Sequence, residues 1–92
     1  MSVASRQVEQ NSVVLSPVAV AASTTAEQSF TVVGARVGDG VLVTKPTAQA
    51  GIGIAGARVI SFNTVGVTFI NATAGSITPT ATETYIFTFF RR

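Results

Sequence analysis

The chain has no cysteine and no histidine, and only 11% of its 92 residues are charged. Without these two residue types, a disulfide framework, a thiolate or imidazole metal site, and a Ser–His or Cys–His nucleophile are all excluded. General acid–base catalysis would then depend on four carboxylates that no motif brings together. We therefore expect no enzymatic activity, no cofactor and no metal site.

Charge of either sign is sparse, and the net charge is only +2. The six basic residues are scattered along the chain, whereas nucleic-acid binding usually needs them clustered on one face. A membrane-spanning helix needs about 20 consecutive apolar residues. The longest apolar candidate, residues 13–22, is much shorter and contains Ser16 and Pro17. The sequence thus predicts neither a nucleic acid nor a membrane as a direct partner.

The chain is rich in β-branched residues, because 33 of its 92 residues are valine, isoleucine or threonine. This composition favours pleated sheets and disfavours long helices. The length indicates a single domain. From residue 28 onward the apolar pattern has period two, and it is clearest where Tyr85, Phe87 and Phe89 alternate with threonine and isoleucine. Further strands are predicted near residues 29–32, 41–44, 57–62 and 64–69, with turn-forming segments at 34–40, 49–53 and 74–79.

Five or six short strands with no helices between them predict an all-β fold. The expected architecture is a small antiparallel β-sandwich or barrel, of the jelly-roll or immunoglobulin-like type, with an extended N-terminal arm. Residues 1–27 are assigned to the arm or an edge segment, and residues 28–92 to the β-sandwich body. Within residues 12–22, Pro17 cannot donate to a central ladder, so we expect either an edge strand or an extended arm there.

Three short motifs imitate functional sites. Gly51-Ile52-Gly53-Ile54-Ala55-Gly56 matches the dinucleotide-binding glycine pattern, but the residues after it predict a strand and not the helix that would hold a pyrophosphate. We interpret it as a glycine loop between strands. Asp39 lies between two glycines and is interpreted as a turn residue, since no other acidic residue is near enough to complete a calcium site. Asn71-Ala72-Thr73 is an N-glycosylation sequon, which we interpret as the end of a strand.

A surface with so few charges is expected where neighbouring subunits cover most of it. An extended arm supports this hypothesis, because a partner would offset the entropy lost on ordering it. Phe90 breaks the alternation of the last strand and faces its threonine side, which points to a subunit interface. The arginines that follow are interpreted either as a contact to an anion or as a terminus that keeps the strand soluble. The candidate partner-contact residues are Val13, Val14, Leu15, Val18, Phe90, Arg91 and Arg92.

Parts of the chain resemble a strand–turn–strand pattern found in small structural modules of tailed bacteriophages. The similar segments are residues 29–43 (SFTVVGARVGDGVLV), 56–59 (GARV), 63–65 (NTV), 67–71 (VTFIN), 74–79 (AGSITP) and 84–87 (TYIF). The resemblance implies a capsid cement or decoration protein, or the corresponding module of a tail fibre. Such a protein would be a homotrimer seated on the lattice of the major capsid protein, at the capsid exterior of the virion. A chain that starts at Met1 with its own arm and ends just after its last strand favours the cement protein.

Other functional classes stay open from the sequence alone. The alternative is a receptor- or glycan-binding β module associated with a tail fibre, although few exposed aromatic residues are expected to stack on sugars. An extracellular bacterial β-subunit would need a better secretion signal than residues 1–22 supply. The arm hypothesis predicts that aspartate at Val13, Val14 and Leu15 abolishes particle binding and leaves the body folded.

Overall fold

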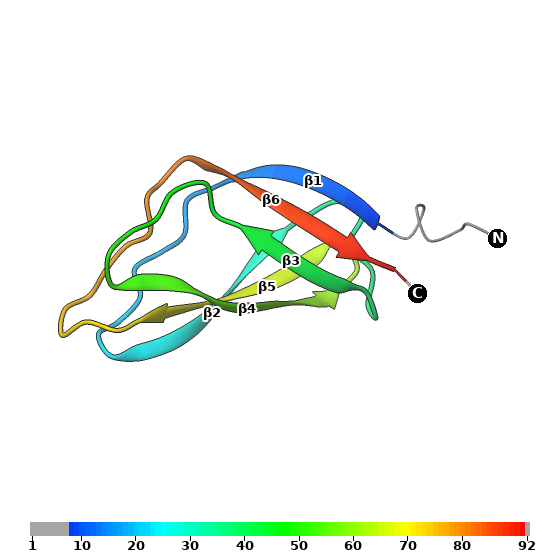
Figure 1. Ribbon diagram of the computed structural model, residues 1–92. Helices are drawn as coiled ribbons and strands as arrows, with labels where there is room; N and C mark the ends of the chain where they lie inside the picture. The colour runs from blue at the N-terminus through cyan, green and yellow to red at the C-terminus, as the bar shows by residue number, and fades with distance from the viewer. Residues whose placement is uncertain (1–7, 92) are drawn as a thin grey trace.

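Six antiparallel strands form the computed structural model, which describes residues 8–91 (Figure 1). The strands β1, β6 and β3 form one three-stranded sheet in that order, and β2, β5 and β4 form the other. No helix occurs in the described residues, so the predicted all-β class is confirmed. The strand bounds are β1 (Val8–Leu15), β2 (Thr24–Thr31), β3 (Gly40–Thr44), β4 (Ile52–Ser61), β5 (Thr64–Asn71) and β6 (Glu83–Phe90).

The central strand of the first sheet is β6, and it has the alternation that its sequence predicts. Tyr85, Phe87 and Phe89 are fully buried, because every second side chain of a strand points to the same face of the sheet. On one side, β6 pairs in unbroken register with all eight residues of β1. On its other side, it pairs with all five residues of β3.

The central strand of the second sheet is β5, which buries Val65, Val67 and Phe69. Its pairing with β2 is regular over eight residues. Its pairing with β4 has two register shifts, one between Ile54 and Gly56 and one between Val59 and Ser61. Such bulges bend a strand and increase its twist. The edge strand β4 is therefore irregular in its pairing with β5, whereas the edge strand β2 is regular.

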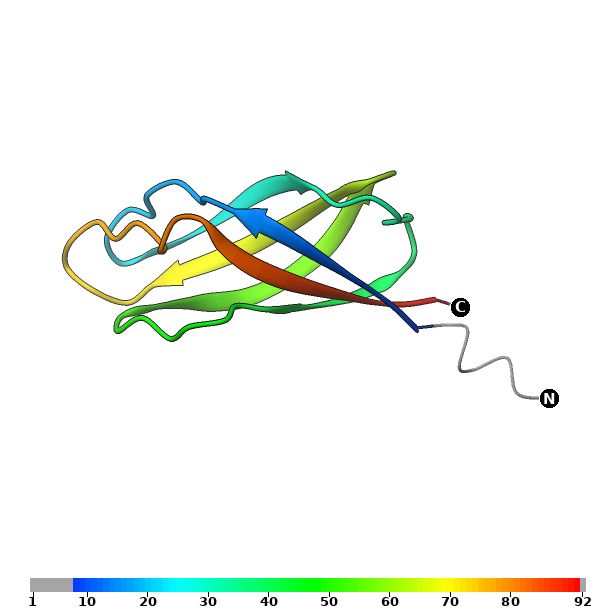
Figure 2. The same ribbon diagram turned by 90° about the horizontal axis from the view of Figure 1, so that it is seen from above.

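The two sheets pack face to face and enclose one hydrophobic core (Figure 2). Aromatic residues of β6 and apolar residues of β5 fill its centre, and Leu15, Val20 and Val32 extend it from the first strand and the connections. Within the described part of the chain, no continuous ladder joins the first sheet to the second. Of the two predicted architectures, the protein therefore has the sandwich.

The predicted loop at Gly51–Gly56 is wrong, because β4 begins at Ile52. Ile52 and Ile54 pack against the core, and this apolar alternation outweighs the conformational freedom of the glycines between them. Only Gly51 lies in a turn conformation, with a φ of 82°. A Cβ atom there would lie 2.2 Å from the Cγ2 of Thr73, so glycine is needed both for its backbone angle and for close packing.

The division between arm and body is also corrected, because residues 8–27 lie within the sandwich. Of the two alternatives for residues 12–22, the edge strand is the one observed: β1 runs to Leu15 beside β6. Pro17 follows the end of β1, where its missing N–H costs no ladder bond. Residues 1–7 of the predicted arm lie outside the described residues.

The connection from β1 to β2 is held in place by side-chain hydrogen bonds. The amide of Gln28 donates to the carbonyl of Val18 and accepts from its N–H, each at 2.9 Å. Asn71, only 1% exposed, donates from Nδ2 to the carbonyls of Val20 (2.9 Å) and Gly75 (2.8 Å). Its Oδ1 accepts from the Thr73 N–H at 2.9 Å. The interpretation of the sequon as the end of a strand is confirmed, since Asn71 is the last residue of β5 and its amide is committed to these bonds.

Candidate functional site

Among residues 8–91, no charged side chain lies on the outer face of the first sheet, and we call it the uncharged face. It is defined by every second residue of three strands in register, which places Val8 beside Phe90 and Leu42 beside Thr88. A hydrogen bond of 3.2 Å from Gln10 Nε2 to Thr88 Oγ1 joins two of its strands across the face. The members are Val8, Gln10, Ser12, Val14, Gly40, Leu42, Thr44, Thr84, Ile86, Thr88 and Phe90.

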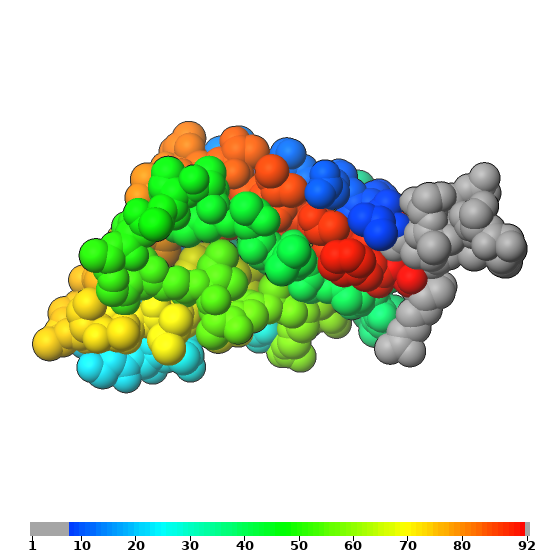
Figure 3. All heavy atoms as spheres, viewed as in Figure 1, coloured from blue at the N-terminus to red at the C-terminus, as the bar shows by residue number. Residues whose placement is uncertain are grey.

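Five large apolar side chains of the uncharged face are exposed, from 38% for Ile86 to 60% for Val14; the others are Val8, Leu42 and Phe90. Phe90 points to the threonine side of β6, as its sequence position predicts. Gly40 lies directly beside Phe90, and a Cβ atom there would be in ordinary van der Waals contact with the Cβ of Phe90, at 3.6 Å. Figure 3 shows β3 (green), β6 (orange to red) and β1 (blue) side by side on the surface.

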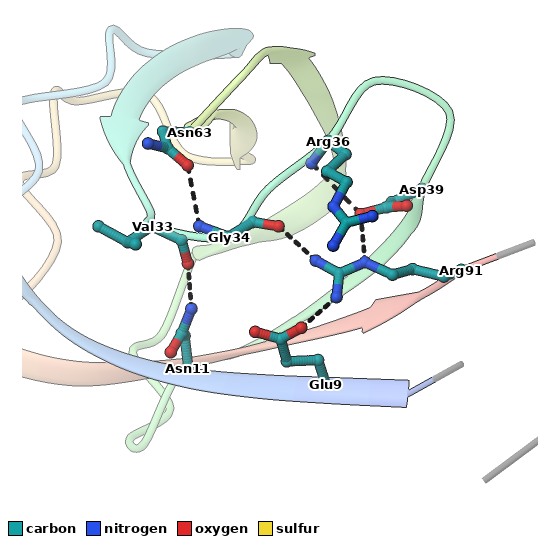
Figure 4. A network of polar contacts seen from close by, with 8 residues as sticks. All are labelled: Glu9, Asn11, Val33, Gly34, Arg36, Asp39, Asn63 and Arg91. Atoms are coloured by element: carbon teal, nitrogen blue, oxygen red, sulfur yellow. Dashed lines mark hydrogen bonds and ion pairs between the residues drawn. The ribbon is translucent and has the colours of Figure 1, made fainter. Parts of the chain in front are cut away.

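Charged groups gather at the end of the sandwich where β1 begins and β6 ends, around Arg91 (Figure 4). Arg91 Nε donates to Asp39 Oδ2 at 3.2 Å, and its other nitrogens contact Glu9 and the carbonyl of Gly34. Hydrogen bonding to Glu9 is the main reason that the pKa of Arg91 is raised. The guanidinium thus fastens the β2–β3 connection to the first sheet.

A second ion pair lies at the opposite end of the first sheet, where β3 ends and β6 begins. Lys45 Nζ is 3.0 Å from Glu83 Oε1, and both side chains are about nine-tenths buried. A hydrogen bond from the Thr47 hydroxyl, assisted by Lys45, lowers the pKa of Glu83 against the opposing effect of burial. Tyr85 follows on the same face, with a hydroxyl that has no hydrogen-bond partner among the described residues. Burial, and then the charge of Glu83, raise its pKa.

The outer face of the second sheet differs from the uncharged face because it has an ion pair at its centre. Arg58 on β4 donates from Nε (2.8 Å) and NH2 (2.9 Å) to the two carboxylate oxygens of Glu27 on β2. The pair lies over Gly66 of β5, where a Cβ atom would come within 2.4 Å of Glu27 Oε2. All four carboxylates of the described chain are therefore ion-paired, and none of them lies on the uncharged face.

The predicted contact residues separate into different environments. Val14, Val18 and Phe90 are exposed, and Val14 and Phe90 share the uncharged face. Leu15 is only 7% exposed and belongs to the core, and Val13 packs against it.

The assignment of Val13 and Leu15 to a partner-binding arm is therefore corrected, because both face inward from an edge strand. Arg91 is mostly buried in its ion pairs, so it is neither a free anion contact nor a solvated terminus. Arg92 lies outside the described residues.

Of the five exposed apolar members of the uncharged face, three were not predicted as contact residues, namely Val8, Leu42 and Ile86. The alternation predicts that Leu42 and Ile86 point outward. Apolar residues at such outward positions were the signal that could have assigned them to the uncharged face. Val8 was missed because the edge strand was expected only within residues 12–22, whereas β1 begins at Val8. Asp39 has the role predicted for it: it accepts from the Arg36 N–H at 3.3 Å within a turn.

Comparison with protein-family models, with curated proteins and with solved structures gave no match. Within residues 8–91, no group of three or more acidic, histidine or cysteine side chains could hold a metal ion. The same residues include no helix of the length and apolarity that crossing a membrane requires. The uncharged face is therefore the feature from which a function is argued.

Proposed function

We propose that the protein is a structural protein that decorates the capsid of a tailed bacteriophage and docks on the lattice of the major capsid protein through its uncharged face. The observation that supports this most is the exposure of five large apolar side chains on a face without charge. Contiguous exposed apolar surface is typical of protein–protein contacts. The phage assignment rests on the resemblance of residues 28–90 to small phage modules. The homotrimeric state that this resemblance implies stays a prediction, and it is an alternative to a pairing of two copies through β1.

The size of the uncharged face favours binding to a lattice over binding to a single partner. Eight residues at about 3.3 Å each and three strands about 4.8 Å apart give a footprint of about 26 by 14 Å. This is roughly half of the about 800 Å² per partner that a standard specific interface buries. Linked copies on a repeating lattice would compensate through avidity, since each bound contact raises the effective concentration of the next. The proposed mechanism is mechanical: bound copies bridge neighbouring capsid subunits.

Co-sedimentation with purified capsids tests the proposal. The double variant L42D/I86D places two charges on β3 and β6 of the uncharged face, and both positions are exposed. We expect it to fold normally and to lose at least about tenfold in capsid affinity, since unpaired charges would be desolvated at the contact. The control variant I70D changes an exposed residue on the outer face of the second sheet and should bind like the wild type.

Equal binding of L42D/I86D and the wild type would exclude the uncharged face as the docking surface. If the wild type did not co-sediment and instead bound polysaccharide from a host cell surface, the alternative of a tail-fibre glycan-binding module would replace the proposal. Both outcomes come from the same purified protein.

A further inference from the structure

Each sheet of the sandwich ends in two edge strands, and unpaired backbone groups on such edges invite pairing with another chain. The edge of β3 is protected by its length of five residues and by Lys45 and Pro46, which follow it. Two bulges and the charge of Arg58 disrupt the edge of β4. Short strands, bulges, charges and proline are the common devices that block edge pairing.

The edge of β2 also has protection, from the β1–β2 connection that Gln28 holds at Val18. The edge of β1 has none of these devices. Its eight residues are in unbroken register with β6, it contains neither proline nor lysine, and its single charge, Glu9, is paired with Arg91. Among the described strands, none covers its second edge.

We propose that β1 pairs antiparallel with β1 of a second copy of this chain, so that two first sheets join into one six-stranded sheet. A twofold axis perpendicular to the sheet keeps both uncharged faces on the same side. Residues that lie opposite each other then point to the same face, so both residue numbers are even or both are odd. The register centred on Asn11 meets this condition. It places Val8 opposite Val14 of the second copy, and Glu9 opposite Val13, so that no like charges meet.

Two observations favour a second copy over a different strand as the occupant. The β1 sequence is complementary to itself in this register, because its two most exposed valines, Val8 and Val14, cover each other. Joining two sheets also widens the uncharged face from about 14 to about 29 Å at the usual strand spacing. Its footprint then reaches about 750 Å², close to the about 800 Å² per partner of a standard interface. The argument from footprint size rests on the proposed docking through the uncharged face, whereas the self-complementarity of β1 does not.

Light scattering over a concentration series tests the pairing. We expect the wild type to have a mass near twice the chain mass of 9.4 kDa. The double variant V8K/V14K would set like charges opposite each other at both pairs and should halve this mass. The charge-swapped V8K/V14E restores opposite charges at the same positions and should keep the dimer. The control V37K adds one charge at an exposed residue of the β2–β3 connection and should stay dimeric.

Cysteine cross-linking fixes the register independently, since the chain has no cysteine of its own. A mixture of the single variants V8C and V14C should form a disulfide-linked dimer on mild oxidation, because directly opposed Cβ atoms in a sheet are about 4.5–5.5 Å apart. A mixture of V8C with V37C is the control and should not cross-link at a comparable rate.

A wild-type mass of one chain or of three chains would overturn the pairing, and so would equal masses for V8K/V14K and V8K/V14E. None of these outcomes bears on capsid docking, because the docking test changes residues of β3 and β6 and uses capsids. In turn, loss of capsid binding by L42D/I86D at an unchanged dimer mass would leave the pairing intact.

Discussion

Glu83 is a buried carboxylate whose charged form is stabilised by Thr47 and Lys45, and this makes the stability of the protein depend on pH. Its pKa in the folded state lies below the ordinary value of 4.5. The unfolded chain therefore binds more protons than the folded protein when the pH falls below about 5. The stabilisation is fully present above the unfolded pKa and is lost as the pH falls through the folded pKa.

We expect the wild type to lose stability steadily as the pH is lowered from about 5 to about 2. The variant E83Q should be less stable at neutral pH, because it leaves the ammonium of Lys45 buried without its counter-charge. It should also lose less stability on acidification. Urea denaturation at a series of pH values measures both effects.

The control for this prediction is E27Q. The pKa of Glu27 is also lowered, by its hydrogen bond with Arg58, but this pair lies on the surface, where solvent screens it. E27Q should therefore change the pH profile less than E83Q does. Parallel profiles for the wild type and E83Q would contradict the assignment of the acid sensitivity to Glu83.

At the scale of elements, β1 contributes side chains both to the uncharged face and to the core. Val14 points outward on the uncharged face and Leu15 points into the core, although they are neighbours in sequence. Aspartate at Leu15 would bury an unpaired charge, which costs about 3–5 kcal/mol and is a large part of the stability of a small domain. Aspartate at Val14 stays in water, where surface substitutions change the free energy of unfolding by about 0.5 kcal/mol or less.

We therefore expect L15D to unfold the sandwich and V14D to leave it folded, as followed by circular dichroism and thermal denaturation. This replaces the arm hypothesis, in which aspartate at both positions would spare the body. A folded L15D with an unchanged melting temperature would show that β1 is not an integral part of the sandwich.

The sequence predicted the elements whose apolar alternation is regular. In β6, the positions of Tyr85, Phe87 and Phe89 predict which side chains face the core. In β5, Val65 and Val67 do the same, because a buried sheet face selects large apolar residues at period two. The outward direction of Phe90 followed from the same pattern. The sequence therefore predicted part of the uncharged face, namely which residues of β6 point outward.

Elements with a weak alternation were predicted only in part. In β1, the inward position Asn11 is polar, and its side chain donates to the carbonyl of Val33, a residue that local sequence cannot identify as its partner. In β4, two glycines interrupt the apolar pattern of the first half, which was interpreted as a loop, and the pairing with β5 decides its conformation. The buried amide of Asn71 likewise depends on Val20, which lies 51 positions away. Contacts of this range are set by the fold as a whole.

At the scale of the whole molecule, charge is concentrated at the two ends of the first sheet and on the outer face of the second sheet. Of the described residues, a partner on the uncharged face would therefore meet apolar and neutral polar groups only. Salt screens attractions between exposed charges but has little effect on apolar contacts. Capsid binding should accordingly be almost independent of ionic strength.

We expect the capsid affinity to change by less than about threefold between about 0.05 and 0.5 M NaCl. Co-sedimentation at fixed pH measures this, with L42D/I86D as the variant without binding. A fall of tenfold or more at high salt would instead assign the contact to a charged surface, either the Arg91 end of the sandwich or the outer face of the second sheet around Arg58.

The antiparallel pairing of β1 with β6 brings the first and last strands of the sandwich to the same end, with Val8 beside Phe90 (Figure 1). A force that pulls these two strand ends apart meets the hydrogen-bonded pairs of the ladder one after another, as when a zipper opens, because the bonds lie perpendicular to the strands. A load applied across the uncharged face is instead shared by three strands at once. The protein would thus peel open at low force when held by its ends, yet resist the outward pressure of a surface to which its face is bound.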